Sequence, residues 1–354
     1  MKLFTVGPVA MFPRTLKIAS EQLPYFRTSE FSDLMLENAS LFRKSVRASE
    51  EAKVVFLTAS GTGGMEASVI NCFDKRDKLL VINGGEFGKR FSQICDIHGI
   101  AYDEVKMDFG DGLTSEALVP YEDVTYSGML VNLHETSTGQ LYNMKLLSSF
   151  CKRKHMYLVA DAIGAYGADA IDFEQDGIDV LITSSQKALA LAPGISVVVI
   201  SERMFRERVS SISSGSMYLD FMLHIKNMER GQTPFTPAVD VLIQMQDRLK
   251  DIDRIGIETL NRRTHNLALR FRTNAVKDGW EIPQYPLSDA LTPLLMKPYA
   301  EKMYLRLKDE YGLVVTPSGG KLKDTMLRIG HLGNVEWKDY EQLLEAMRRI
   351  RESI

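Results

Sequence analysis

The chain has few cysteines and histidines, and none of them is spaced as a metal site or a disulfide framework requires. Its 354 residues include three cysteines and six histidines. Cys72, Cys95 and Cys151 form no CxxC pair and fall in helical patterns, so we expect reduced thiols of the core. His134-Glu135 lacks the second histidine of an HExxH zinc site, because Thr138 stands there. We therefore expect no metal site.

The chain also lacks a large excess of charge and long apolar runs. Its formal net charge of -3, without basic clusters, gives no electrostatic attraction to nucleic acid or to anionic membranes. The longest apolar runs, such as Ile195–Ile200, are too short to span a bilayer. Residues 1–12 are broken by Gly7-Pro8, which argues against a secretory signal. We expect a cytoplasmic protein that binds neither nucleic acid nor membranes.

What the sequence does contain is a repeated order of short strand-like runs and helical patterns. Seven apolar runs alternate with helical patterns, at residues 54–57, 79–82, 102–106, 129–133, 157–160, 180–182 and 196–200. This order predicts an α/β domain in which helices cover a mostly parallel sheet. An amphipathic helix is expected before it, at about residues 30–49.

The pattern changes after about Pro237. Two long helical stretches, 239–253 and 258–277, are followed by short strand-like pieces and a final amphipathic helix, which predicts a small α+β domain. The expected organisation is an N-terminal arm over residues 1–20, a large domain over 21–245 and a small C-terminal domain over 246–354. The arm has no period and is expected to turn at Gly7-Pro8.

Two neighbouring strand-like runs end in residues that could carry out chemistry. Asp161 follows the run at 157–160, and Ser184-Ser185-Gln186-Lys187 follows the run at 180–182. Open α/β sheets bind ligands at the carboxyl ends of their strands. A lysine in an apolar crevice can form a Schiff base, and a buried carboxylate can keep a pyridine nitrogen protonated, so the pair suggests pyridoxal phosphate. Taken alone, a lysine at a strand end is usually just solvated, and Asp161 could simply cap a turn or the helix that follows.

A glycine loop and an aromatic residue follow two other strands. Gly61-Thr62-Gly63-Gly64 lies between a strand and a helical pattern, where free backbone N–H groups can surround a phosphate. A tight turn is the alternative, and the loop is neither a Walker A sequence nor GxGxxG. Phe87 could stack on a planar ring, or pack in the core as most aromatic side chains do.

Two further polar positions stand out. Thr136 and its neighbours follow the strand at 129–133, where their hydroxyls could bind a cofactor or cap a helix. Arg328 interrupts an apolar strand, and a guanidinium there suits bidentate binding of a carboxylate. An internal salt bridge is the alternative for Arg328.

The ordered set of motifs resembles the class V, fold-type I pyridoxal-phosphate aminotransferases, and most closely their alanine–glyoxylate and serine–pyruvate group. The matching stretches are TVGP at 5–8, RTSEF at 27–31, SGTGGMEA at 60–67, NGGEFG at 83–88, HETSTG at 134–139, Asp161, SSQK at 184–187 and LRIG at 327–330. They cover nearly the whole chain in family order.

The resemblance implies a role for each motif. Lys187 would hold the cofactor as a Schiff base, and Asp161 would pair with its pyridine nitrogen. The other implied cofactor contacts are Phe87 stacked on the ring, Thr136 at its polar edge, and Gly61, Thr62, Gly63 and Gln186 at its phosphate. Arg328 would bind the substrate's α-carboxylate, and the backbone around Gly7 would border the pocket.

The resemblance also implies a homodimer with shared active sites. In this family a threonine of the other subunit reaches the phosphate, and Thr236 fits that position. Gln232 or Thr233 would be its companion. Many relatives have a histidine where this chain has Phe26, and a tyrosine near Thr233.

The expected activity is ping-pong transamination between a small α-amino acid, alanine or serine, and a small 2-oxo acid, glyoxylate or pyruvate. The alternative within the class is a 2-aminoethylphosphonate–pyruvate transaminase. A class V lyase or desulfurase is less favoured, because desulfurases need a cysteine on a mobile loop. A different class of function, a nucleotide-binding regulatory module, would use the glycine loop alone.

Overall fold

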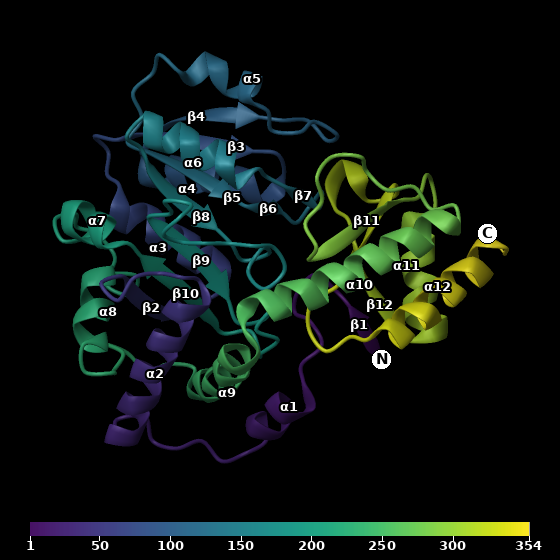
Figure 1. Cartoon of the computed structure of the whole chain (residues 1–354), viewed down its shortest axis with the longest axis horizontal. Helices are drawn as coiled ribbons and strands as arrows, with labels where there is room; N and C mark the ends of the chain where they lie inside the picture. Colours follow the sequence, from purple (N-terminus) through teal and green to yellow (C-terminus); the bar gives the residue numbers. More distant parts are fainter. Residues whose placement is uncertain (354) are drawn as a thin grey trace.

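Seven strands form the central sheet of the large domain, within the residues 1–353 that the computed structural model describes (Figure 1). They are β2 (Lys53–Thr58), β3 (Lys78–Asn83), β4 (Ala101–Lys106), β5 (Gly128–Asn132), β8 (Tyr157–Asp161), β9 (Val180–Ser184) and β10 (Ile195–Ile200). The order across the sheet is β2-β10-β9-β8-β5-β3-β4, and only β10 runs antiparallel to its neighbours. The expected mostly parallel α/β sheet is therefore confirmed, with strand ends displaced by one or two residues.

The central strands are buried along their whole length. Every residue of β5, β9 and β10 is buried, as expected for strands that helices cover on both faces. Alternate side chains enter two separate apolar cores. Val54 and Phe56 of β2 belong to one core, whereas Val55 and Leu57 belong to the other.

Helices cover both faces of this sheet. The first core packs against α2 (Ser29–Ser45), α6 (Met144–Arg153) and α9 (Val239–Ile255), and the second against α3 (Gly61–Cys72), α4 (Glu86–His98) and α8 (Phe221–Met228). Shorter helices are α1 (Pro13–Ala19), α5 (Ser115–Leu118) and α7 (Glu202–Met204), and short helical turns span Val119–Tyr121, Phe205–Val209 and Gly320–Leu322. The three cysteines are buried in α3, α4 and α6.

The small domain has its own sheet and core. Its sheet has the order β1-β12-β13-β11, formed by β1 (Lys2–Phe4), β11 (Leu291–Leu295), β12 (Leu313–Pro317) and β13 (Met326–Gly330). Its helices are α10 (Ile257–Lys277), α11 (Ala300–Tyr311) and α12 (Trp337–Arg351). Side chains of all three helices join the strands in a third apolar core.

The N-terminal segment is partly ordered as secondary structure, which the sequence did not suggest. Residues 2–4 form β1, which pairs in parallel with β12, and residues 13–19 form α1. Three residues carry too little local pattern to predict a strand whose partner lies about 310 positions later in the chain.

The passage between the domains occurs at Gly256. Helix α9 packs against α1 and α2, and the chain turns at Gly256 (φ +82°) before α10 extends towards the small domain (Figure 1). The expected boundary at 245/246 thus falls inside α9. Among residues 1–353, no helix is long and apolar enough to cross a membrane.

Candidate active site

A cavity of about 310 Å³ lies at the carboxyl ends of the parallel strands and collects most of the expected site residues. Those that line it are Gly7, Gly61, Thr62, Phe87, Thr136, Asp161, Gln186 and Lys187. They come from six separate segments of the chain. The cavity therefore joins the predicted catalytic pair, the glycine loop, the aromatic residue and the N-terminal segment in one place.

Asp161 and Lys187 line this cavity at the carboxyl ends of two adjacent parallel strands, Lys187 three residues beyond the end of β9. Asp161 ends β8 and is paired in register with Ile182 of β9, five residues before Lys187. The Asp161 carboxylate accepts a hydrogen bond from the backbone N–H of Ile163 at 2.8 Å. Burial raises the pKa of Asp161 to about 7, and the Ile163 bond and the Lys187 charge oppose that rise. Burial lowers the pKa of Lys187 to about 8 against the opposing charge of Asp161, so its neutral amine is accessible near neutral pH.

The N-terminal segment lies directly against the lysine. Lys187 Nζ donates a hydrogen bond to the Val6 carbonyl at 2.5 Å, and the Val9 N–H donates to the Gln186 carbonyl at 3.2 Å. Gly7 has φ +134°, and a Cβ there would lie 2.6 Å from Lys187 Cδ and 2.8 Å from Nζ. Only glycine fits between this segment and the lysine.

The first turn of α3 offers an anion site. The helix begins at Gly61, the Ser60 side chain does not cap it, and its first hydrogen bond joins the Gly64 N–H to the Ser60 carbonyl at 3.3 Å. No hydrogen bond within residues 1–353 uses the N–H groups of Gly61, Thr62 or Gly63. Such free N–H groups at the positive end of a 12-residue helix fit a phosphate.

A short hairpin brings further polar groups to the cavity. It is formed by β6 (His134–Glu135) and β7 (Gln140–Leu141), and His134 and Thr136 both line the cavity. His134 is 3% exposed, and neither ring nitrogen has a hydrogen-bond partner within the described chain. Burial lowers the pKa of His134 to about 3, so the imidazole is neutral. An unpaired buried group beside a cavity is typical of a binding site.

Glu135 fixes the start of α4 and with it Phe87. Its fully buried carboxylate accepts from the N–H groups of Gly88 at 3.0 Å, Phe87 at 3.4 Å and Ser137 at 3.1 Å. Asn132 Nδ2 donates to the same carboxylate at 2.9 Å. The aromatic ring is thus carried on a helix end whose N–H groups are satisfied by a buried acid.

Arg90 also lines the cavity, although we did not single it out in the sequence. Its guanidinium lies over the Phe87 ring, with Cζ 4.8 Å from the ring centroid, and Nη1 donates to Thr62 Oγ1 at 3.0 Å. The available signal was its spacing of three residues from Phe87 on a helix, which places both side chains on one face.

Arg328 lies outside this cavity, in an adjoining one of about 810 Å³ that shares Phe87 with it. Its Nη1 donates to the Thr136 carbonyl at 2.9 Å and its Nη2 to the Pro317 carbonyl at 2.8 Å, while Nε is buried without a partner. Burial lowers the pKa of Arg328 to about 10, and the charge of Glu135 opposes this. Arg328 forms no ion pair with any residue from 1 to 353, so the internal salt bridge is not found.

Gly63 and Thr236 do not line the cavity. Gly63 lies in the first turn of α3, where a Cβ would approach Ala59 Cβ to 2.8 Å. Thr236 is exposed on the loop between α8 and α9. Both candidate companions are engaged within their own chain: Gln232 Nε2 donates to Ser32 Oγ at 2.7 Å, and Thr233 Oγ1 donates to the Phe235 carbonyl at 2.7 Å.

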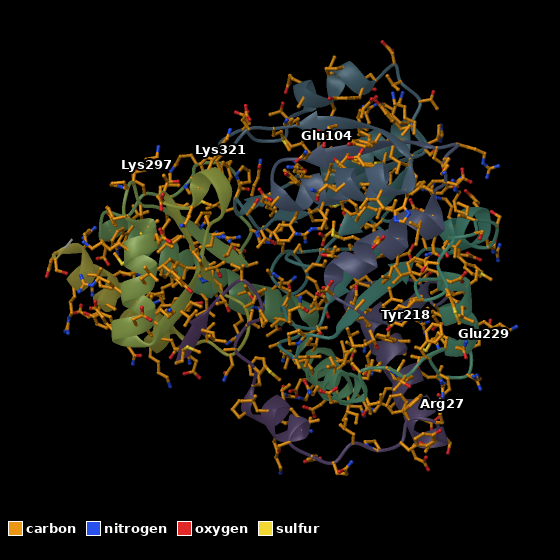
Figure 2. The ribbon with its side chains drawn as sticks, turned by 180° about the vertical axis from the view of Figure 1, so that it is seen from behind. Arg27, Glu104, Tyr218, Glu229, Lys297 and Lys321 are labelled. Atoms are coloured by element: carbon orange, nitrogen blue, oxygen red, sulfur yellow. The ribbon has the colours of Figure 1, made fainter. Side chains whose placement is uncertain are left out.

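The loop that carries Thr236 is held at one edge of the large domain. Arg27 Nη1 donates to Gln232 Oε1 at 3.0 Å and to the Thr233 carbonyl at 2.7 Å. In Figure 2, Arg27, Tyr218 and Glu229 all lie at the edge of the large domain that is remote from the small domain. Tyr218 stacks on Phe235 of the same loop, with ring centroids 5.3 Å apart.

Within residues 1–353, no group of three histidine, cysteine or acidic side chains could hold a metal ion. A separate cavity of about 690 Å³, lined in part by α10, contains none of the expected site residues.

Comparison with known proteins agrees with this geometry. The chain is 29% identical over 321 residues to a 2-aminoethylphosphonate–pyruvate transaminase of Bacteroides fragilis, covering 86% of each chain. It is 25% identical to an L-aspartate–glyoxylate aminotransferase of Paracoccus denitrificans, over 94% of this chain and 86% of that one. A crystal structure of an alanine–glyoxylate aminotransferase from Nostoc sp. superposes with a TM-score of 0.91 at 22% identity, covering 98% and 94% of the two chains. The family model described as aminotransferase class-V matches residues 24–274, and this chain belongs to that family.

Proposed function

We propose that this aminotransferase uses pyridoxal phosphate to exchange an amino group between alanine or serine and glyoxylate or pyruvate, with ping-pong kinetics. The observation that carries the proposal is the single cavity that joins Asp161, Lys187 and the unpaired N–H groups of α3. A nucleotide-binding module would need the helix end, but not the acid and the lysine.

The residues present fit this cofactor. When bound, pyridoxal phosphate supplies an aldehyde that reacts with amines and a pyridine ring that accepts electrons. The N–H groups of Gly61, Thr62 and Gly63 would bind its phosphate, with Gln186 beside them, and Phe87 would stack on its ring. Asp161 would hold a proton on the ring nitrogen. Thr136 and His134, whose ring nitrogens are unpaired, line the cavity and would bind the polar substituents of the ring.

Lys187 would act as both nucleophile and proton carrier. The pKa depression that burial imposes on Lys187 makes its amine available as a nucleophile. If a substrate amine took its place, Nζ would remove the proton from the substrate Cα as a general base and deliver it to the former aldehyde carbon of the cofactor as a general acid. The Val6 carbonyl, which accepts from Nζ, would hold the free amine in position.

The choice of substrate rests on Arg328. This half-buried guanidinium without an acidic partner suits the α-carboxylate of an amino acid and of a 2-oxo acid. The names of the Nostoc and Paracoccus proteins support glyoxylate as an acceptor. The Bacteroides relative supports the second candidate, in which Arg328 would bind a phosphonate. A desulfurase is disfavoured because all three cysteines are buried in helices.

The proposal includes a homodimer in which Thr236 of the partner subunit completes the phosphate site. The exposed position of Thr236 at the edge of the large domain supports it, since in its own chain this hydroxyl does not line the cavity. The side-chain bonds of Gln232 and Thr233 within their own chain favour Thr236 as the direct contact.

The test is spectroscopic. Purified protein mixed with pyridoxal phosphate is expected to show an absorbance band at about 410–430 nm that borohydride fixes covalently to the chain. Lys187→Ala should abolish the trapping, because no other lysine lines the cavity. Lys226→Ala, an exposed position on α8, is the matched control and should leave the trapping unchanged. Trapping that survives Lys187→Ala would refute the assignment.

Loss of this band on addition of an amino donor then identifies the substrate. Alanine and serine are expected to bleach it, and glyoxylate or pyruvate to restore it. Bleaching by 2-aminoethylphosphonate, but by neither amino acid, would establish the second candidate instead.

A further inference from the structure

Arg90 is the one cationic side chain, besides Lys187, that lines the candidate cofactor cavity. It lies on α4, one turn after Phe87, and is half-buried. It forms no ion pair with any acidic residue of the described chain. An ion pair therefore does not explain why a positively charged side chain lies beside the cavity.

We propose that Arg90 is a positioning residue that locks the Phe87 ring and the Thr62 hydroxyl into the arrangement that binds pyridoxal phosphate. The inference rests on the proposed function and deepens it. One guanidinium would thus connect the two ends of the cofactor site, which are the Phe87 ring and the first turn of α3 that carries Thr62.

The contacts carry this assignment. The guanidinium covers one face of the Phe87 ring, with Cζ 4.8 Å from the centroid, which leaves the other face for a planar ligand. At the same time Nη1 donates to Thr62 Oγ1 at 3.0 Å. The threonine oxygen is thereby engaged as an acceptor, so its own proton remains free to be donated to an anion.

The two ends that Arg90 joins belong to different helices. Thr62 lies in the first turn of α3 and Phe87 in the first turn of α4. Glu135 fixes the backbone of Phe87 but does not touch its ring or Thr62 by any hydrogen bond of the described chain. Arg90 therefore supplies a constraint that the backbone contacts do not.

The assignment requires an arginine rather than any cation. A planar guanidinium can stack on a ring and donate sideways to a hydroxyl at once, whereas a lysine ammonium is a point charge on a flexible stem. Arg90→Lys should therefore resemble Arg90→Gln if the role is positioning, and should resemble the wild type if only positive charge is needed.

The experiment measures the dissociation constant of pyridoxal phosphate from cofactor-depleted protein, together with the visible circular dichroism of the bound cofactor. Both Arg90→Gln and Arg90→Lys are expected to raise the dissociation constant about tenfold. They should also reduce the dichroic band, which reports the orientation of the ring. A loss of overall structure would show in the thermal midpoint of the cofactor-depleted protein, and Arg90→Lys is the variant least prone to it.

The matched control is Arg153→Gln. Arg153 lies three residues after Phe150 on α6, with Cζ 5.4 Å from that ring, in the same relation as Arg90 to Phe87 but away from the cavity. It should change neither the dissociation constant nor the dichroic band. A double-mutant cycle with Thr62→Ala adds a second criterion, because residues that act through one another are not additive. Arg90→Gln is expected to raise the dissociation constant by a clearly smaller factor in the Thr62→Ala variant than in the wild type.

The outcomes separate the two proposals. Wild-type protein that binds no pyridoxal phosphate would overturn the proposed function, and this inference with it. If the wild type binds pyridoxal phosphate and Arg90→Lys binds it equally tightly, only the positioning role is overturned. The same holds if the effects of Arg90→Gln and Thr62→Ala on the dissociation constant are fully additive.

Discussion

At the scale of single residues, the site depends on two groups whose protonation the fold alters in opposite senses. Burial raises the pKa of Asp161 and lowers that of Lys187, so each is pushed towards its neutral form. A bound, protonated pyridine nitrogen would supply a positively charged partner for the Asp161 carboxylate. The cofactor-depleted protein should therefore carry a measurable electrostatic penalty at this site.

The first prediction concerns the pH dependence of that penalty. The pKa of Asp161 is raised from 3.8 to about 7, so between about pH 4 and 7 the folded protein holds a proton that the unfolded chain has released. The contribution of Asp161 to stability must fall as the pH rises through this window. Asp161→Asn keeps the acceptor for the Ile163 N–H and removes the titration. We expect its thermal midpoint, without cofactor, to fall by a few degrees less than that of the wild type between pH 5 and 7.5 (rough limits set by the two pKa values).

Asp169 provides the matched control for this measurement. Burial also raises its pKa to about 7, although it lines the separate cavity beside α10. Asp169→Asn should change the pH dependence in the same sense and leave cofactor binding unaltered, whereas Asp161→Asn should change both. Identical pH profiles for Asp161→Asn and the wild type would contradict the assigned burial effect.

The residue positions that could be predicted from the sequence were those tied to strand ends. Asp161 and Lys187 lie where parallel strands end, and adjacent strands bring such positions together. His134 and Arg90 could not be assigned in this way. Whether a buried imidazole has partners, or which hydroxyl a guanidinium reaches, depends on segments distant in sequence, such as Gly164 and Thr62.

At the scale of secondary-structure elements, the start of α4 depends on a close fit to the buried Glu135 side chain. Glu135 accepts hydrogen bonds from three backbone N–H groups and from Asn132. Gly85 must be glycine, since a Cβ there would lie 2.6 Å from Glu135 Cδ. The acid and the helix start are thus fitted closely to each other.

The second prediction follows from this arrangement. Glu135→Gln retains the size of the side chain but directs an NH₂ group at N–H donors, which leaves buried donors unpaired. We expect it to lower the free energy of unfolding by about 1–3 kcal/mol and to weaken cofactor binding through displacement of Phe87. Chemical denaturation and titration with pyridoxal phosphate measure the two effects. Glu86→Gln, an exposed change in the same helical turn, should alter stability by only a few tenths of a kcal/mol (an order-of-magnitude estimate); equal effects of the two variants would show that Glu135 is not a cap.

The elements themselves were largely predictable, because apolar periodicity is a local property. All seven expected strands of the large sheet are present, and the helix expected at 30–49 is observed at Ser29–Ser45. Its earlier end reflects Arg47, whose φ of 57° is incompatible with a helix. The strand β1 was not predictable, because only its pairing with β12 makes it a strand.

At the scale of the whole molecule, the N-terminal segment links the small domain to Lys187. β1 is part of the small sheet, Phe4 lies in the core of that domain, and two residues later the Val6 carbonyl accepts from Lys187 Nζ. Movement of the small domain would therefore shift the segment that contacts the lysine. Within the expected arm of residues 1–20, this segment therefore contacts both the small sheet and the candidate site.

The last prediction tests whether one site is built from two chains. If Thr236 completes the phosphate site of the partner subunit, Lys187→Ala and Thr236→Val impair different halves of the same composite site. Each variant alone should have low activity, with Lys187→Ala inactive and Thr236→Val reduced about tenfold (an estimate for one lost hydrogen bond to a charged group). In a mixed dimer, however, one of the two sites has both its own Lys187 and the Thr236 of the other chain. After unfolding and refolding of an equal mixture, half of the dimers are mixed, so activity should rise to about one quarter of the wild-type value.

Mixing without refolding is the control, and should give only the mean activity of the two variants. Activity that stays at this mean after refolding, in a sample shown by sedimentation to be dimeric, would mean that each chain completes its own phosphate site.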